Sequence, residues 1–266
     1  PVDARHPTLA GELLEVAAAQ GDVCTVANDN DPGQVVISGH KSAIDRAIEI
    51  AKEMGLSVAD YQELLGKVRG TQLVYLEDMA GAEGDNDEGI AGINWNVQIM
   101  PLKFLGRGGF GTTKDAIEAI NYAINRKQSG INVRVINASW GSTMYSKALE
   151  DAIGAAGENG ILFVAAAGNA TTDNDKRPHY PSNYNLPNVI SVAATDKNDN
   201  IASFSNFGIK TVHIAAPGRE ILSTWLNDEY REASGTSMAT PVVSGVAALV
   251  LSVEPDLSVK ELRERL

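Results

Sequence analysis

A serine in front of a long apolar run is the residue best suited to covalent chemistry in this chain. Ser237 lies within GTSMATP, residues 235–241, and the apolar stretch that follows, residues 242–251, predicts a buried helix. The free N–H groups at a helix N-terminus favour negative charge, so an oxyanion forming beside the Ser237 hydroxyl would be stabilised there. Acyl transfer requires this stabilisation. The alternative is that Ser237 is only the N-cap of the helix.

Two further polar segments follow apolar runs that alternate with helical patterns. Alternation of this kind predicts an α/β fold with a parallel sheet that is covered by helices on both faces. Ser139 and Asn169 each come just after a predicted strand, and the carboxyl ends of parallel strands share one edge, so both residues are expected in the crevice that holds Ser237. The predicted strands are residues 98–103, 133–138, 162–166 and 189–193, and the predicted helices are residues 113–126, 146–158 and 257–266.

Together these segments resemble the subtilisin-like serine peptidases, in that family's order, from about residue 84 to the C-terminus. The resemblance implies a subtilisin-like fold and an endopeptidase that hydrolyses peptide bonds through an acyl-enzyme at Ser237. The matching segments are GTSMATP, VQIMPLKF at residues 97–104, NASWG at 137–141, AAAGN at 165–169, HYPS at 179–182 and AAPG at 215–218.

The same resemblance implies a role for each matching site residue. Ser237 would be the nucleophile, and the side-chain amide of Asn169 would donate a hydrogen bond to the oxyanion. An extended peptide would be the substrate and would bind by strand addition. The residues implied in substrate binding are Ser139, Trp140, Gly141 and Gly168.

The family's catalytic Asp and His motifs do not occur in this sequence. Residues 69–72 have the spacing of the histidine motif, but Arg69 stands where the general base would be, and a guanidinium has no lone pair with which to accept a proton. Asp78 is only a weak substitute for the acid, and His179 and His213 are expected to be structural. The predicted sheet is therefore incomplete at its N-terminal side and the peptidase inactive or strongly impaired. The alternative is a non-catalytic pseudopeptidase or a chimeric peptide-binding protein.

The first part of the chain has a different pattern. Residues 1–55 read as helix, strand, turn, strand and helix, which predicts a small α+β module. Residues 1–55, through the segment 26–55, resemble the small ferredoxin-like subdomain of malonyl-CoA:acyl-carrier-protein transacylases, so a protein related to acyl transferases is a second alternative. No GxSxG nucleophile motif occurs in the sequence. The predicted organisation is a module at 1–55, a junction at 56–83 and a partial peptidase domain at 84–266.

An acidic loop at residues 84–92 resembles the calcium loop of the same family. The resemblance implies a side-chain oxygen ligand from Asn86 and carbonyl ligands from Gly84, Glu88 and Ile90. Calcium takes six to eight oxygen ligands. The loop thus supplies half a site, and a solvated acidic loop is the alternative that we favour.

Charge and composition restrict the partners. The 266 residues carry a formal net charge of -12, which argues against nucleic acid or an anionic membrane as partner. We expect no signal peptide in the first residues and no membrane span. The single cysteine, Cys24, excludes an internal disulfide framework. The family resemblance implies an extracellular location, although the sequence leaves the compartment open.

Overall fold

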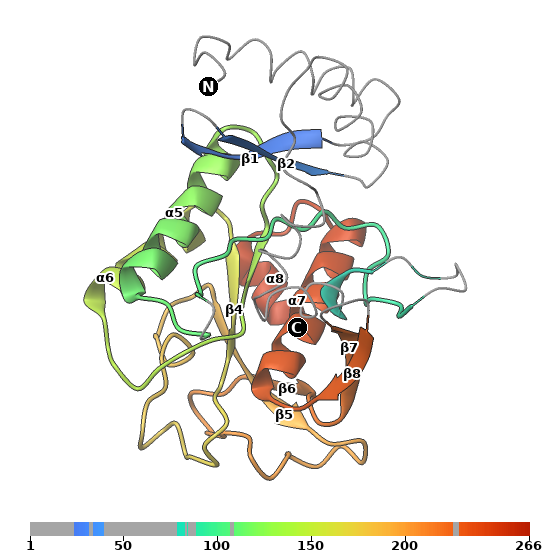
Figure 1. The fold of residues 1–266 in the computed structure, drawn as a ribbon. Coiled ribbons are helices and arrows are strands. Elements are labelled where there is room, and N and C mark those ends of the chain that lie inside the picture. The colour runs from blue at the N-terminus through green and yellow to red at the C-terminus, as the bar shows by residue number, and fades with distance from the viewer. Residues whose placement is uncertain are drawn as a thin grey trace. The chain divides into compact units, whose positions relative to one another are not determined.

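The computed structural model describes residues 24–31, 34–39, 79–82, 84, 89–106, 109–225 and 229–266. The chain divides into two compact units, residues 1–67 and 68–266. The described part of the first unit is a strand pair, and the second unit contains a sheet with helices (Figure 1). The predicted boundaries of the module at residue 55 and of the junction at residue 83 stay predictions.

In the first unit, β1 (Cys24–Asp31) pairs with β2 (Gln34–Gly39) in antiparallel orientation. The prediction of two strands here is confirmed, but β1 continues through residues that were predicted as a turn. The register shifts twice along the pair, between Val26 and Asn28 and between Asn28 and Asp31. These irregularities let the polar segment stay in the ladder despite its turn-forming composition. The two helices of this module, predicted at residues 9–20 and 41–54 from the spacing of their apolar residues, lie outside the described residues. The resemblance to transacylases stays a prediction.

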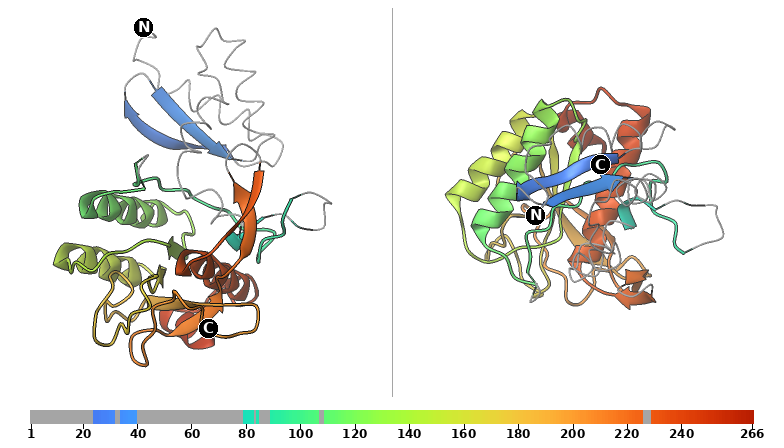
Figure 2. Two further views of the ribbon diagram at one scale, coloured as in Figure 1. Left: turned by 60° about the horizontal axis from the view of Figure 1, so that its bottom comes forward. Right: turned by 45° about the horizontal axis from the view of Figure 1, so that its top comes forward.

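The second unit is organised around a parallel sheet of four strands in the order β3-β4-β5-β6. Helices α5 and α6 cover one face and contact each other, whereas α7 and α8 lie on the other face (Figures 1 and 2). The predicted α/β architecture with helices on both faces is confirmed. The strands are β3 (Val135–Ala138), β4 (Leu162–Ala166), β5 (Val189–Thr195) and β6 (Ile214–Pro217), and the helices are α5 (Thr113–Gln128), α6 (Lys147–Glu158), α7 (Thr236–Val253) and α8 (Val259–Arg265).

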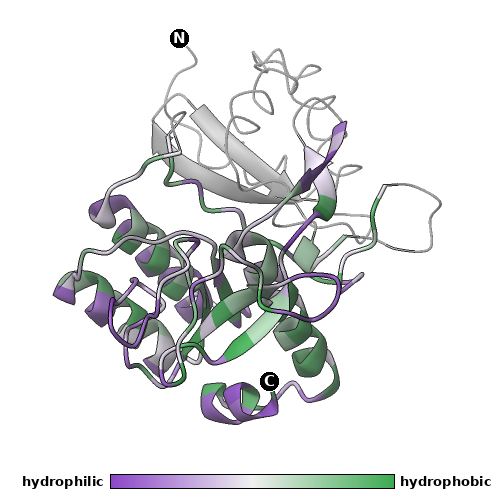
Figure 3. Cartoon of the chain, turned by 90° about the horizontal axis from the view of Figure 1, so that it is seen from below, coloured by the Kyte–Doolittle hydropathy of each residue, from purple (hydrophilic) through white to green (hydrophobic). Residues whose placement is uncertain are grey.

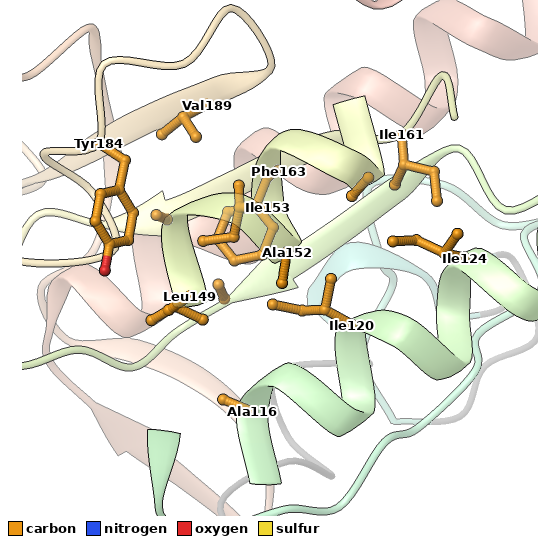
Figure 4. Close-up of a cluster of buried hydrophobic side chains, with 13 residues drawn as sticks. Ala116, Ile120, Ile124, Leu149, Ala152, Ile153, Ile161, Phe163, Tyr184 and Val189 are labelled. Atoms are coloured by element: carbon orange, nitrogen blue, oxygen red, sulfur yellow. The ribbon is translucent and has the colours of Figure 1, made fainter. Parts of the chain in front are cut away.

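Strand β4 separates two hydrophobic cores, because successive side chains of a strand point to opposite faces. Phe163 and Ala165 pack with the inner sides of α5 and α6, as Figure 4 shows for Phe163. Leu162 and Val164 point the other way, toward α7 and α8. All five residues of β4 are buried, as expected for a strand covered on both faces. In Figure 3 the hydrophobic colour is concentrated on the central strands, and α5 and α6 carry mixed colours that match their one-sided burial.

Helix α7 contacts all four strands of the sheet. By length and composition alone it could cross a membrane, but more than half of it is buried inside the fold, so its apolar character is explained by the core. Its first turn also packs through Met238 against an antiparallel hairpin. The hairpin consists of β7 (Ile221–Trp225) and β8 (Glu229–Ala233).

The strand predicted at residues 98–103 is wrong, since these residues have no strand structure. In the described sheet β3 is an edge strand and does not pair with them. Pro101 lies in the middle of the run and has no N–H to donate to a ladder. An apolar run becomes a strand only when a neighbouring strand accepts and supplies its backbone hydrogen bonds. The apolar run at residues 73–76 also predicts a strand, but it lies outside the described residues.

Candidate active site

The predicted crevice forms where β3 and β4 end and α7 begins. Ser139 directly follows β3, and Asn169 follows β4 after a short loop. The N-cap of α7 is Gly235 and its first helical residue is Thr236, so Ser237 lies inside the first turn and is not the N-cap. Hydrogen bonds between the first turn of α7 and both strand ends hold these segments together. The structure thus brings the three predicted polar residues to one place.

Asn169 is held by its side-chain oxygen. Its Oδ1 accepts hydrogen bonds from the backbone N–H of Thr236 at 2.8 Å and from the Thr236 hydroxyl at 3.0 Å. The Thr236 hydroxyl oxygen also accepts from the N–H of Gly168 at 3.1 Å. Gly168 has φ +108°, a left-handed conformation that favours glycine. Because the oxygen of the Asn169 amide is occupied, its two N–H donors are the groups left to meet a ligand.

Ser237 and Ser139 exchange two hydrogen bonds. The Ser237 hydroxyl donates to the Ser139 carbonyl oxygen at 3.2 Å, and the Ser139 hydroxyl donates to the Ser237 carbonyl oxygen at 2.8 Å. The second bond compensates for Pro241, which lies inside α7 and has no N–H for the carbonyl four residues before it. Asn137 donates from Nδ2 to the Ser139 hydroxyl at 3.0 Å. The start of α7 is therefore fixed to the end of β3 through side chains.

Replacement of Ser139 with alanine is expected to destabilise the fold by about 1–3 kcal/mol, because the carbonyl oxygen of Ser237 would lose its partner in a half-buried site. Urea unfolding of the full chain measures the change. Ser129→Ala is the control. The exposed Ser129 hydroxyl donates to the carbonyl of Asn125, and this carbonyl keeps a second partner, the backbone N–H of Ser129, when the hydroxyl is removed. Equal losses for the two variants would contradict the proposed role of Ser139.

The backbone N–H of Ser237 is a second donor in the crevice. The first N–H groups of a helix have no acceptor within the helix. The N–H of Thr236 bonds to Asn169, but no acceptor for the Ser237 N–H is recorded among the described residues. This N–H and the Asn169 side-chain amide are therefore both available to donate to a ligand in the crevice.

A general base does not contact Ser237 within the described ranges, where its hydroxyl donates to a backbone carbonyl. His213 accepts from the N–H of Ser191 at 2.9 Å through Nδ1, and its Nε2 lies 3.0 Å from a guanidinium nitrogen of Arg263. Burial, and then the Arg263 charge, lower the pKa of His213. His213 was also predicted to lie on a buried strand, but it directly precedes β6.

His179 also makes its hydrogen bonds to groups other than Ser237. Its backbone N–H donates to Asn183 Oδ1 at 3.1 Å, and burial lowers the pKa of its ring. Arg69 and Asp78, which occupy the places of the missing base and acid, lie outside the described residues.

A buried asparagine network supports the loop that carries Asn169. Asn206 is 2% exposed; its Oδ1 accepts from the N–H groups of Ala170 and Thr172, and its Nδ2 donates to the carbonyl of Ala167 and to Asn174 Oδ1. Asn174 is fully buried and donates to the same carbonyl. Sequence analysis missed this network, because an asparagine between a serine and a phenylalanine gives no signal of burial.

Asp175 joins the next part of this loop to residues 209–211. Its carboxylate accepts from the Thr211 hydroxyl at 2.7 Å and from the backbone N–H groups of Ile209, Lys210 and Thr211. These bonds favour the ionised form. The Thr211 hydroxyl is the largest cause of the lowered pKa of Asp175.

The lowered pKa predicts a loss of stability in acid. Asp175 stabilises the fold fully above the ordinary carboxyl pKa of about 4, and this contribution disappears as the pH falls through the lower pKa of the folded state. Asp175→Asn should therefore be less stable than the native chain at pH 7 and should lose less on acidification. Urea unfolding at pH 7 and at an acidic pH tests this. Asp256→Asn, at an exposed position, is the control. An unchanged slope of stability against pH in Asp175→Asn would contradict it.

The predicted calcium ligands fall partly outside the described residues, because Asn86 and Glu88 are not described. Gly84 and Ile90 are described and could offer only their carbonyl oxygens. No group of three or more His, Cys, Asp or Glu side chains that could hold a metal ion occurs among the residues with described positions. The calcium ion stays a prediction.

Comparisons with known proteins identify relatives of the second unit. The model of the Subtilase family, Peptidase_S8, matches residues 78–266. Subtilisin-like protease 2 of Plasmodium falciparum is 41% identical over 172 residues, 63% of this chain and 12% of that protein. Subtilisin DY of Bacillus licheniformis is 40% identical over 183 residues, 68% of this chain and 64% of that protein.

A solved structure shows the same similarity. Sphericase superimposes with a TM-score of 0.65 and 32% sequence identity, over 72% of this chain and 66% of that one. The chain thus spans less than two thirds of the length of each of these three relatives.

Proposed function

Because the chain belongs to the subtilase family, we propose that its crevice binds an extended peptide and holds a peptide carbonyl beside Ser237 for acyl transfer. The observation that carries the proposal is the pair of hydrogen bonds from Thr236 to Asn169 Oδ1. They fix the amide so that its N–H donors are available to the developing oxyanion. The substrate class that we propose is peptide or protein in extended conformation.

The proposed reaction is hydrolysis in two steps. The Ser237 oxygen attacks the carbonyl carbon, the amine leaves with a proton, and water then cleaves the ester that remains. The N–H groups of Ser237 and Asn169 would stabilise the negative oxygen in both steps. The peptide backbone would pair with the segment that follows β3, the edge strand of the described sheet. This segment consists of Ser139, Trp140 and Gly141.

We propose that this peptidase is strongly impaired. A serine hydroxyl without an adjacent base is a poor nucleophile. In a subtilisin, removal of the triad lowers turnover about a million-fold, and a rate about a thousand-fold above water remains from oxyanion stabilisation and binding. The Ser237 hydroxyl donates to the Ser139 carbonyl, and this contact favours the second candidate, a pseudopeptidase that binds peptides without cleaving them.

Reaction with a fluorophosphonate tests the state of Ser237. The full chain should react about a million-fold more slowly than an intact subtilisin, and Ser237→Ala should not react at all. Equilibrium binding of a tetrapeptide amide, measured by calorimetry, tests the binding function separately. Rapid labelling at Ser237 would contradict the proposed impairment. If the native chain binds no peptide, both the impaired peptidase and the pseudopeptidase are contradicted.

Two further expectations accompany the proposal. A calcium ion at residues 84–90 would raise the unfolding temperature when calcium replaces a chelator, and identical temperatures would contradict it. An extracellular location is proposed from the family resemblance. The resemblance of residues 1–55 to transacylases contributes nothing to the proposed activity.

A further inference from the structure

A cavity of about 280 Å³ lies where β3 and β4 begin, at the edge of the sheet opposite the crevice. Arg134 directly precedes β3, Gly160 comes just before β4, and Lys127 belongs to the last turn of α5. The cavity is also lined by residues 255–258, between α7 and α8. Because β3 and β4 are parallel, the length of these strands separates the cavity from the crevice at their carboxyl ends. The cavity is therefore a site of its own.

The guanidinium of Arg134 is fixed at the wall of this cavity. It donates to the carbonyl of Pro255 at 2.5 Å and to the carbonyl of Leu257 at 2.6 Å. These two bonds connect the start of β3 with the turn between α7 and α8. A guanidinium has more N–H donors than these two carbonyls occupy, so further donors remain for a ligand.

Lys127 brings a second positive charge to the cavity. Its ammonium donates to the carbonyl of Val133 at 2.7 Å. Burial, and then the charge of Arg134, lower the pKa of Lys127, so the two cations lie close enough to repel each other. A Cβ atom added to Gly160 would lie 3.8 Å from Cε and 3.9 Å from Nζ of Lys127. Because glycine has no side chain, nothing from residue 160 covers the ammonium.

Neither cation has an acidic partner in the part of the chain that the structure describes. The recorded hydrogen bonds of both groups go to backbone carbonyls, and the ion pairs between described residues involve other side chains. Among the described residues that line the cavity, only Asp256 is acidic, and it has no recorded ion pair with either cation. Two like charges at one cavity repel each other, and an anion bound between them would remove this repulsion.

We propose that the cavity binds an oxyanion of the phosphate type, either a free phosphate ion or a phosphomonoester, between Lys127 and Arg134. Phosphate oxygens accept strong hydrogen bonds from ammonium and guanidinium groups. The bound anion would connect the end of α5, the start of β3 and the turn between α7 and α8, and would stabilise the second unit by mass action. The inference does not involve Ser237 and does not depend on the proposed function.

Calorimetric titration of inorganic phosphate into the full chain, at constant ionic strength, tests the inference. The native chain should bind phosphate saturably, and its unfolding temperature should rise with the phosphate concentration. Lys127→Gln removes the charge and should weaken binding by about tenfold or more. Lys127→Arg keeps the charge and should bind within about threefold of the native affinity. Lys114→Gln is the matched control, because Lys114 is an exposed lysine of the same helix that pairs with Glu118, and it should leave the affinity unchanged.

Asp256→Asn should have the opposite effect. It removes the carboxylate that lines the cavity and repels an anion, so phosphate should bind about twofold to fivefold more tightly. Glycerol phosphate distinguishes the two sources of the ligand, because tighter binding than inorganic phosphate indicates a phosphomonoester and weaker binding indicates the free ion. Lack of saturable phosphate binding by the native chain overturns the inference, and so does native affinity in a folded Lys127→Gln variant. The titration of the native chain does not depend on whether a variant folds.

Discussion

Asn169→Ala is expected to slow acylation of Ser237 by about 100-fold to 1,000-fold. The residual reactivity of a serine without a base comes from binding and from the oxyanion donors, so the loss of one donor removes a large share of it. The magnitude is the one measured for an oxyanion-hole asparagine in a subtilisin and is transferred from there. The rate constant for reaction with a fluorophosphonate in excess measures the effect.

Asn169 also accepts two hydrogen bonds from Thr236, so its replacement can disturb the fold as well as remove the N–H donors. A second variant separates the two effects. Asn169→Asp keeps an acceptor for Thr236 and loses the N–H donors, so it should be at least as slow as Asn169→Ala while its unfolding temperature stays nearer to that of the native chain. Ser237→Ala gives the background rate. If Asn169→Asp reacts as fast as the native chain, the amide is not an oxyanion donor.

The elements of the second unit were predictable where periodicity and burial agree. Predicted residues 162–166 coincide with β4, because a strand covered on both faces is apolar throughout and its limits are visible in the sequence. Predicted residues 146–158 match α6, whose N-cap is Ser146. The position of Ser237 in the first turn of α7 follows from the small residues before it and the apolar run behind it.

Long-range pairing could not be predicted from local pattern. Residues 98–103 have the composition of a strand, but whether they form one depends on a neighbouring strand and not on their own side chains. The His179 ring lies against both Gly141 and Gly168, and no spacing rule indicates contacts among these three segments. The hydrogen bond from the Ser139 hydroxyl to the Ser237 carbonyl, which replaces the one that Pro241 cannot donate, is equally unpredictable from local pattern.

The role of Asn206 likewise cannot be predicted from the sequence, and its replacement is the second change for which we expect a large effect. Asn206→Ala should lower the free energy of unfolding by about 2–4 kcal/mol, because a buried amide with four hydrogen bonds is removed and its partners lose theirs. The reactivity of Ser237 should also fall, by about tenfold to a hundredfold, since the loop that positions Asn169 loses its support and small misplacements of a donor are costly. Urea unfolding and fluorophosphonate labelling measure the two effects.

Asn188→Ala is the control that distinguishes positioning from general destabilisation. Asn188 is 1% exposed and donates from Nδ2 to the carbonyls of Ile153 and Ile161, on the α6 side of the sheet. Its replacement should also destabilise the fold, but the folded variant should label at the native rate. If both variants lose reactivity in proportion to their stability, Asn206 acts only as a structural residue. If Asn206→Ala alone loses reactivity, the buried network sets the geometry of the oxyanion donors.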